Sequence, residues 1–312
     1  MKGNTGPRPL NHAPAARATT MAQSGLNSGL GTQRAVNVRV APRRRRSPSR
    51  ADQQDLEVKL TALQKDYADL HTAIFEAAQV HRRLCAPRLV RDGNFEIASE
   101  IFAVRHLPGD FFTIKKAGGA VILALGDICG KGLAAGMRTT HLVGLVAAHA
   151  ALNTDPESIV AAVNRDVCRM GSVAPLASLF LAKLDPLTGR LQYCSAGHPP
   201  ALFLRAGGRL ELLSEGGLLL GVTAAAPYKS GRIDLGAGDV LLTYSDGILE
   251  SLNDAEEEFG YARLETQLRH AQNGSADAML FSVLGAVQDF AATRPLADDM
   301  SLVIIRRDTQ IH

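Results

Sequence analysis

The stretch that decides the fold is Gly118–Gly132, GGAVILALGDICGKG, in which a glycine turn, an apolar run and an acidic loop follow one another. Ala120–Leu125 contains no polar residue, which is typical of a β-strand buried on both faces. The paired glycines predict a tight turn before this strand, because glycine adopts the positive φ that such turns need. Lys131–Leu152 is rich in Ala, Leu and Met and predicts a helix. Asp127 therefore lies where a buried strand gives way to a helix.

Short strand and helix patterns extend from this stretch in both directions. The further strands that we expect are Phe95–Ala103, Phe111–Lys116, Leu176–Leu184, Leu191–Ser195, Ala201–Arg205, Arg209–Leu213, Val240–Tyr244 and Met300–Arg306. The further helices are Pro156–Met170, Tyr261–Arg269 and Asp277–Ala292. We expect the two strands before Ala120 to be its neighbours in one antiparallel sheet. Because strands and helices are grouped rather than strictly alternating, the pattern predicts α+β layers.

The N-terminal 50 residues differ in charge from the rest of the chain. The whole chain has 34 basic and 31 acidic residues, and ten of the basic residues, with no acidic one, lie in residues 1–50. The remaining 24 basic and 31 acidic residues give the rest a net charge of −7. Few apolar residues and no periodicity predict that residues 1–50 form a disordered basic tail. The run Arg43–Arg46 could contact nucleic acid or an anionic membrane, and a tail without a partner is an equally good interpretation.

Residues 51–86 contain apolar positions at alternating steps of four and three. Neither Gly nor Pro interrupts them, so they predict one long amphipathic helix with a coiled-coil-like seam, ended by Pro87. We favour a parallel homodimer through this seam, and packing against the chain's own globular part is the alternative. The seam consists of Leu56, Leu60, Leu63, Tyr67, Leu70, Ile74, Ala77, His81 and Leu84.

Composition and segment lengths exclude several classes of protein. The chain is 46% hydrophobic and 21% charged, as is typical of globular proteins. The longest nearly apolar stretch, Leu142–Leu152, is much shorter than the roughly 20 residues of a membrane span. The N-terminus has no secretory pattern, so we expect a cytoplasmic protein. Four cysteines without a C-x-x-C pair predict reduced, buried thiols rather than disulfides or a zinc ribbon.

Acidic residues stand at the ends of several predicted strands, each beside a turn residue. These are Asp110, Asp127, Asp246 and the pair Asp298–Asp299. One such aspartate commonly bonds only its own backbone, but four corners of this kind could converge on a single site. Carboxylates without His or Cys partners favour Mg²⁺ or Mn²⁺ over zinc. The loop that follows Gly126 is not a Walker A motif, because Gly132 rather than Ser or Thr follows Lys131.

Six motifs follow one another along the chain: Pro108–Phe112, Gly126–Gly132, Leu184–Gly189, Ala196–Pro200, Gly238–Gly247 and Asp298–Leu302. In this order they resemble the motifs of the SpoIIE-type branch of the metal-dependent (PPM) serine/threonine phosphatases. The resemblance covers about residues 86–308, and we place the phosphatase domain at residues 87–308. The resemblance implies a four-layer α-β-β-α sandwich of two antiparallel sheets flanked by helices, which the long N-terminal helix would precede.

The resemblance also implies roles for individual residues. It makes Asp127 a carboxylate that bridges two Mn²⁺ or Mg²⁺ ions, with the carbonyl of Ile128 as a further ligand. Asp246 and Asp298 would complete the shell of one ion, and Asp110 would hold the other. Three further residues receive lesser roles: Asp299 as a weaker candidate ligand, Lys131 as a candidate for phosphate binding, and His198 as a structural rather than catalytic residue. We regard Asp127 and Asp246 as the catalytic pair.

The implied activity is hydrolysis of phosphoserine or phosphothreonine in a protein, by direct attack of water and without a phosphoenzyme. The implied substrate is an anti-sigma-factor antagonist in a bacterial partner-switching pathway of stress signalling. An upstream activator would act on helix 51–86. Two other functions remain open: a catalytically weak or inactive regulator that acts by binding a partner, and an adaptor that uses residues 1–50 to bind nucleic acid or membrane.

Overall fold

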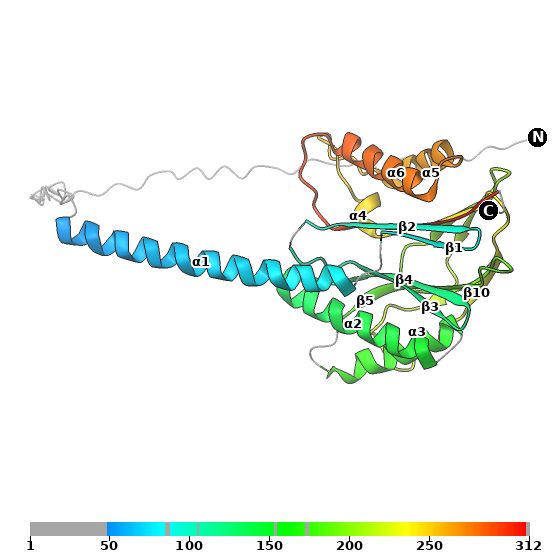
Figure 1. Ribbon diagram of the computed structural model, residues 1–312, viewed down its shortest axis with the longest axis horizontal. Helices are drawn as coiled ribbons and strands as arrows, with labels where there is room; N and C mark the ends of the chain where they lie inside the picture. Colours follow the sequence, from blue (N-terminus) through cyan, green and yellow to red (C-terminus); the bar gives the residue numbers. More distant parts are fainter. Residues whose placement is uncertain (1–48, 85–87, 105, 153–154, 172–174, 310–312) are drawn as a thin grey trace, which may run out of the picture. The chain divides into compact units, whose positions relative to one another are not determined.

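The computed structural model describes residues 49–84, 88–104, 106–152, 155–171 and 175–309 (Figure 1). The predicted basic tail lies outside the described residues except for its last two, and so does Pro87, the predicted end of the helix. Residues 56–312 form one compact unit, which contains every feature discussed below except the start of the first helix. The division of the chain at residues 50 and 86 remains a prediction.

The predicted elements are present with small changes at their ends. The helices are α1 (Arg50–Leu84), α2 (Leu133–Leu152), α3 (Pro156–Arg169), α4 (Asp246–Leu249), α5 (Gly260–Ala271) and α6 (Ala276–Ala291). The strands are β1 (Leu89–Asp92), β2 (Phe95–Phe102), β3 (Phe111–Ala117), β4 (Ala120–Ile128), β5 (Ala177–Leu184), β6 (Arg190–Ala196), β7 (Ala201–Leu204), β8 (Leu210–Leu213), β9 (Gly216–Gly217), β10 (Gly231–Asp234), β11 (Val240–Tyr244) and β12 (Met300–Arg307). The sequence analysis missed β1, β9, β10 and α4, which are all four residues or shorter.

The strands form two sheets, which confirms the predicted α+β sandwich. One sheet has the order β1-β2-β12-β11-β7-β8, and the other has the order β10-β6-β5-β4-β3. All pairs are antiparallel except the short parallel pair of β9 with β6. The prediction that β2 neighbours β3 and β4 is wrong, because β2 pairs with β12 in the other sheet. The segment between β2 and β3 crosses from one sheet to the other, which short-range patterns do not reveal.

Three apolar clusters hold the layers together. The first lies between the sheets and includes Phe95, Phe180 and Leu241, all at most 1% exposed. The second joins the outer face of the β11 sheet to α5 and α6, and the third joins the outer face of the β4 sheet to α2 and α3 (Figure 1). Burial on both faces explains why Ala120–Leu125 has no polar residue.

Helix α1 begins with a reciprocal cap. The Ser49 and Asp52 side chains each accept a hydrogen bond from the other residue's backbone N–H, at 3.2 and 2.9 Å. Along α1 the seam changes character: Leu56 to Leu70 are 53–69% exposed at every seam position, whereas His81 is buried. The C-terminal end of the seam therefore packs against the chain's own globular part, whereas pairing of its exposed N-terminal part with a second copy remains a prediction. No described helix is long and apolar enough to cross a membrane.

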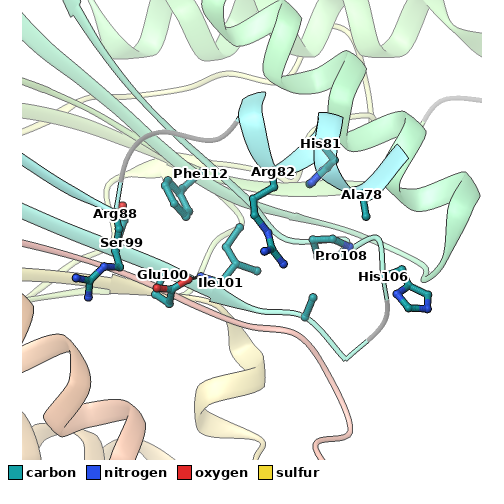
Figure 2. Close-up of a pocket in the computed structure, with 11 residues that line it drawn as sticks. Ala78, His81, Arg82, Arg88, Ser99, Glu100, Ile101, His106, Pro108 and Phe112 are labelled. Atoms are coloured by element: carbon teal, nitrogen blue, oxygen red, sulfur yellow. Dashed lines mark hydrogen bonds between the residues drawn. The ribbon is translucent and has the colours of Figure 1, made fainter. Parts of the chain in front are cut away.

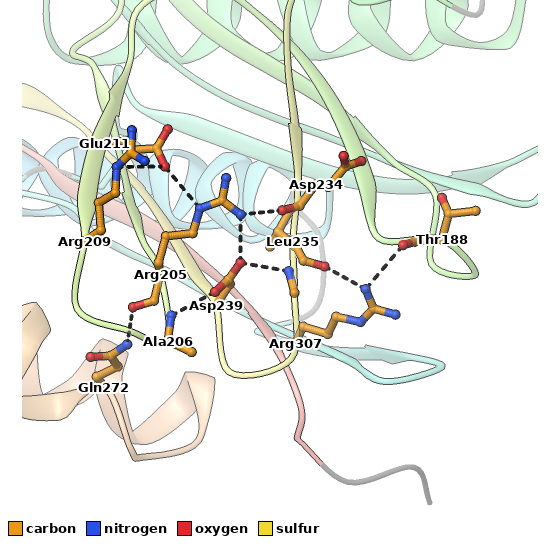
Figure 3. Close-up of polar contacts among 11 residues, drawn as sticks. Thr188, Arg205, Ala206, Arg209, Glu211, Asp234, Leu235, Asp239, Gln272 and Arg307 are labelled. Atoms are coloured by element: carbon orange, nitrogen blue, oxygen red, sulfur yellow. Dashed lines mark hydrogen bonds and ion pairs between the residues drawn. The ribbon is translucent and has the colours of Figure 1, made fainter.

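A polar network fixes the start of β11, at the end of the strand opposite Asp246 (Figure 3). The buried Asp239 carboxylate accepts hydrogen bonds from the backbone N–H groups of Ala206 and Gly236, both at 2.8 Å, and pairs with Arg205 at 3.2 Å. Arg205 also pairs with Glu211 and stacks over the Phe203 ring. Every oxygen of Asp239 is therefore used within the fold, as expected for a structural aspartate.

Candidate functional site

Asp127 lies inside the end of β4, because this strand continues three residues beyond its apolar run. In the antiparallel ladder Asp127 is paired with Ser178 of β5. The preceding residue must be glycine: a Cβ at Gly126 would lie 2.5 Å from the Ser178 carbonyl oxygen and 2.6 Å from the Phe111 ring. The predicted strand ended at Leu125, whereas the structure continues it through Gly126, which lets the strand pack closely against Ser178 and Phe111.

The Asp110 carboxylate is almost completely buried at the start of β3. It accepts a hydrogen bond of 2.5 Å from the Ser301 hydroxyl, and the backbone N–H of Ser301 donates to the Ser245 hydroxyl. Burial raises the pKa of Asp110 well above its usual value, and the nearby Asp127 carboxylate raises it further. Three segments that are distant in sequence thus meet at this carboxylate.

Gly109 is held in place by contacts on both sides of its peptide unit. Its N–H donates to Asp299 at 2.8 Å, and its carbonyl accepts hydrogen bonds from the Thr139 hydroxyl and the Ile128 N–H. The other oxygen of Asp299 accepts the Val104 N–H at 2.8 Å. Both carboxylate oxygens of Asp299 therefore support the loop that carries Asp110.

Asp246 and Asp298 belong to the same acidic region. Asp246 begins α4 and is exposed, and it raises the pKa of Asp127 together with Asp298. Burial is the largest cause of that shift, and the pKa of Asp127 rises to about 6. Lys131 pairs with Asp298 at 2.7 Å and also donates to the Ala297 carbonyl. The structure thus places Lys131 against a predicted ligand.

A pocket opens beside these residues. It has a volume of about 390 Å³ and is lined by Asp127, Cys129, Ser178, Gly197, His198, Pro199, Leu219 and Asp246. Asp127 and Asp246 thus share one pocket although 118 positions separate them in the sequence. Cys129 is exposed here, so the prediction of buried cysteines is wrong for this residue.

The oxygen atoms around Asp127 suit a hard divalent cation. A Cβ placed on Gly109 would lie 3.0 Å from Asp127 Oδ1, 3.1 Å from the Ile128 carbonyl oxygen and 3.2 Å from the Gly130 carbonyl oxygen. Three oxygens therefore converge beside Gly109, where a side chain would crowd them, and all of them are ligands that Mg²⁺ and Mn²⁺ prefer. Within the described ranges, no three His, Cys, Asp or Glu side chains form a ready-made metal-holding group. The fit consequently depends on backbone oxygens as well as carboxylates.

The C-terminal end of α1 borders the loop before Asp110. A cavity of about 350 Å³ lies between this end of α1, β2 and the loop, and Figure 2 shows the side chains that line it. His81 and Arg82 line it from the helix, and His106 and Pro108 line it from the loop. Burial lowers the pKa of His81, and the Asp299 carboxylate partly opposes this shift. The helix end is therefore within electrostatic reach of the residue that holds Gly109.

Sequence reasoning missed the residues that support the acidic side chains. Thr139, Ser245 and Ser301 position Gly109 and Asp110, but isolated hydroxyl residues inside apolar elements give no signal of such a role. Glu250 was also missed: burial and the carboxylates of Asp246, Glu258 and Asp298 raise its pKa. Its position within one turn of Asp246 could have suggested that it adds to the negative charge.

Comparisons with known proteins agree with this geometry. Residues 117–308 match the family model of stage II sporulation protein E (SpoIIE). The phosphoserine phosphatase RsbU of Bacillus subtilis (strain 168) is 23% identical over 246 residues, which cover 77% of this chain and 71% of RsbU.

Solved structures with the same fold include phosphatase domains. The SiaA-PP2C domain of Pseudomonas aeruginosa has a TM-score of 0.68 and 18% identity, over 79% of this chain and 99% of that one. The RsbU and RsbW domains of a Mycobacterium tuberculosis protein give a TM-score of 0.60 and 22% identity, over 69% of this chain and 62% of that one. RsbX in complex with magnesium gives 0.54 and 18%, over 70% and 97%. The chain therefore belongs to the SpoIIE family, in the RsbU/SpoIIE branch of the PPM-type serine/threonine phosphatases.

Proposed function

We propose that this protein is a metal-dependent phosphatase that removes phosphate from phosphoserine or phosphothreonine of a regulatory protein. The observation that carries the proposal is the pocket that Asp127 and Asp246 share. Two further carboxylates lie close by: Asp298 raises the pKa of Asp127, and Asp127 raises the pKa of Asp110. Such crowding of carboxylates is costly without a compensating cation. A site of this kind suits binding of a cation and of a phosphate ester together.

We assign the ligands by what each oxygen already does. Asp127 and the Ile128 carbonyl converge beside Gly109, so we give them the central role. Asp246, Asp298 and Asp110 would contribute further oxygens. We give Asp299 a positioning role, since both of its oxygens accept backbone N–H groups. We therefore propose Asp298, whose Oδ2 pairs with the side chain of Lys131, as the metal-binding member of the pair.

The chain's own residues would divide the work of hydrolysis. When bound, two Mn²⁺ or Mg²⁺ ions would activate water and neutralise phosphate charge. The carboxylates of Asp127 and Asp246 supply the negative charge that would position the cations in the pocket. Burial lowers the pKa of His198 to about 3, so its ring is neutral at pH 7 and does not act as a protonated general acid. Lys131 neutralises Asp298 through their ion pair, so binding of phosphate by Lys131 would require this pair to open.

The substrate that we propose is an anti-sigma-factor antagonist. Support comes from the relative RsbU, whose name describes a phosphoserine phosphatase, and from the neighbour in which RsbU and RsbW domains occur together. A cytoplasmic location would follow from such a substrate and remains a prediction.

Metal-dependent release of phosphate tests this function. The full chain is incubated with p-nitrophenyl phosphate and with phosphorylated antagonist proteins, with Mn²⁺, with Mg²⁺ and with EDTA. We expect hydrolysis only with a divalent cation and its loss in Asp127→Asn and Asp246→Asn. Asp234→Asn, an exposed aspartate of β10, is the matched control and should hydrolyse normally. Equal rates in EDTA and Mn²⁺ would exclude the proposal.

We also propose that a second copy of the chain covers the exposed part of α1. Seam positions Leu56 to Leu70 repeat every three or four residues and are more than half exposed, which suits a parallel two-stranded coiled coil. An upstream activator could act through the same helix, because its other end lies beside the Asp110 loop. Light scattering should show a dimer that Leu63→Glu dissociates, whereas Glu57→Lys should leave it intact. A monomeric wild-type chain would contradict this assignment.

One observation favours the alternative of a weak or inactive regulator. The ion pair of Lys131 with Asp298 occupies a predicted ligand. If that pair persisted in the presence of Mn²⁺, the chain would bind a partner without hydrolysing phosphate, and the activity assay above would detect this. The proposed tail contacts with nucleic acid or membrane concern residues outside the described ranges and remain a prediction.

A further inference from the structure

His198 lies where the chain passes from one sheet to the other. β6 belongs to the sheet that carries Asp127, and β7 lies beside β11 in the sheet that leads to Asp246. The four residues between them, Gly197–Pro200, form the crossover. Gly197 has φ of +63°, and a Cβ there would collide with Leu219, so this turn requires glycine. His198 is therefore placed between the two acidic strands by the topology itself.

His198 contacts the strand that pairs with Asp127, and it lines the pocket that holds both Asp127 and Asp246. Its Nδ1 lies 2.9 Å from the hydroxyl of Ser178, the residue paired with Asp127 across the ladder. Its carbonyl accepts a hydrogen bond of 3.1 Å from the Ser195 hydroxyl, which fixes the backbone of the crossover. The Tyr244 carbonyl, two residues before Asp246, lies near enough to the ring to favour its protonation. The buried Nε2 has no hydrogen-bond partner among the described residues, so that carbonyl does not reach hydrogen-bonding geometry.

The surroundings of the ring favour one of its two neutral tautomers. A neutral imidazole has one N–H and one acceptor nitrogen. The carbonyl of Tyr244 is only an acceptor, which favours the hydrogen on Nε2. Nδ1 then accepts, and the Ser178 hydroxyl must donate to it. The lone pairs of Ser178 Oγ are thereby left for the pocket that Ser178 and Asp127 share.

We propose that His198 is a positioning residue that ties Ser178 of β5 to the crossover between the two sheets and thereby sets the separation of Asp127 and Asp246. The geometry favours this role because one buried ring contacts the ladder partner of the first carboxylate and lines the pocket that holds both carboxylates. A gain of less than an ångström in that separation would weaken a site that both carboxylates must share. This inference rests on the proposed function, because it concerns the site that would hold the cations.

The test measures Mn²⁺ binding to the full chain, by calorimetry, alongside hydrolysis of p-nitrophenyl phosphate. His198→Leu removes the imidazole and its Nδ1 contact with Ser178, and Ser178→Ala removes only the hydroxyl. We expect each variant to need about tenfold more Mn²⁺ for half-saturation. This is the lower end of the loss in metal affinity that follows removal of a residue that orients a metal ligand. His198→Asn should recover most of the affinity, since its side-chain oxygen can replace Nδ1 as the acceptor. At saturating Mn²⁺, the KM for substrate should change less than kcat.

A structural control separates positioning from loss of stability. Asp239→Asn disrupts the buried network at the opposite end of β11. It should lower the unfolding temperature and leave the Mn²⁺ midpoint unchanged. If His198→Leu and Ser178→Ala bind Mn²⁺ like the wild type, or if Asp239→Asn shifts the midpoint equally, the inference is wrong and the proposed function stands. A wild-type chain that neither binds Mn²⁺ nor hydrolyses phosphate would overturn both.

Discussion

Replacing Asp299 by asparagine should destabilise the protein even without metal, whereas the same change at Asp298 should not. Each Asp299 oxygen accepts one backbone N–H at 2.8 Å. A hydrogen bond to a charged group contributes roughly 1.5–3 kcal/mol. Asparagine keeps one acceptor and turns an N–H toward the other donor. Lower repulsion on Asp110 offsets part of this loss, so we expect a net cost of about 2 kcal/mol.

The Asp298 change is the matched control, because it loses a half-exposed ion pair while asparagine keeps the Oδ1 acceptor for the Asp299 N–H. The side chains of Lys131 and Asp298 are 36% and 42% exposed, so the pair contributes only about 0–1 kcal/mol. For a domain of this size, thermal unfolding in EDTA should fall by about 4–8 °C in Asp299→Asn and by no more than ~3 °C in Asp298→Asn. With Mn²⁺ added, Asp298→Asn should show the smaller gain in stability. Equal unfolding temperatures for the two variants in EDTA would refute the assignment of Asp299 to positioning.

Three further predictions concern single residues of the site and its surroundings. In EDTA, Asp127→Asn should be more stable than the wild type above pH 6 and equally stable near pH 4. The folded pKa of Asp127 is about 6 and its ordinary pKa is 3.8, so the stability that this carboxyl contributes at low pH is lost as the pH rises through 6. Denaturant titrations at both pH values would measure the difference. Gly109→Ala should fold and lose at least about tenfold in Mn²⁺ affinity, because its Cβ would stand 3.0 Å from Asp127 Oδ1; unchanged calorimetric binding would argue against a cation in that space. Asp239→Asn should lower the free energy of unfolding by about 2–3 kcal/mol with kcat unaltered, and a change in kcat would mean that the network reaches the site.

Most of the fold could be predicted because its elements carry local signals. Ala120–Leu125 is apolar because both its faces are covered, and Pro156 stands at the first turn of α3 as expected. Which strands share a sheet was not predictable in the same way. β2 and β3 are consecutive in sequence but lie in different sheets, because the segment between them crosses the sandwich. No short-range pattern distinguishes such a crossover from a hairpin.

The acidic residues of the candidate site could be found from their places at strand ends, but their individual roles could not. Asp239 and Asp246 both follow or precede β11 beside a glycine, yet the first is bonded within the fold and the second lies in the pocket. Asp298 and Asp299 are adjacent but have different partners. Both Asp299 oxygens accept N–H groups of a distant loop, whereas the Asp298 oxygens accept the Asp299 N–H and pair with Lys131. Only three-dimensional contacts reveal which oxygens are already used. The order of the motifs indicated the family, whereas hydrogen bonds separate supporting residues from ligands.

Location of Mn²⁺ by anomalous X-ray scattering tests the central claim most directly. Crystals of the full chain soaked in Mn²⁺ should show two peaks, each within about 2–2.6 Å of an Asp127 oxygen. Asp246 and the Ile128 carbonyl should lie in the coordination shells, and Asp127→Asn crystals should lose the peaks. Peaks elsewhere, or none at Asp127 in protein that hydrolyses phosphoserine, would contradict the account.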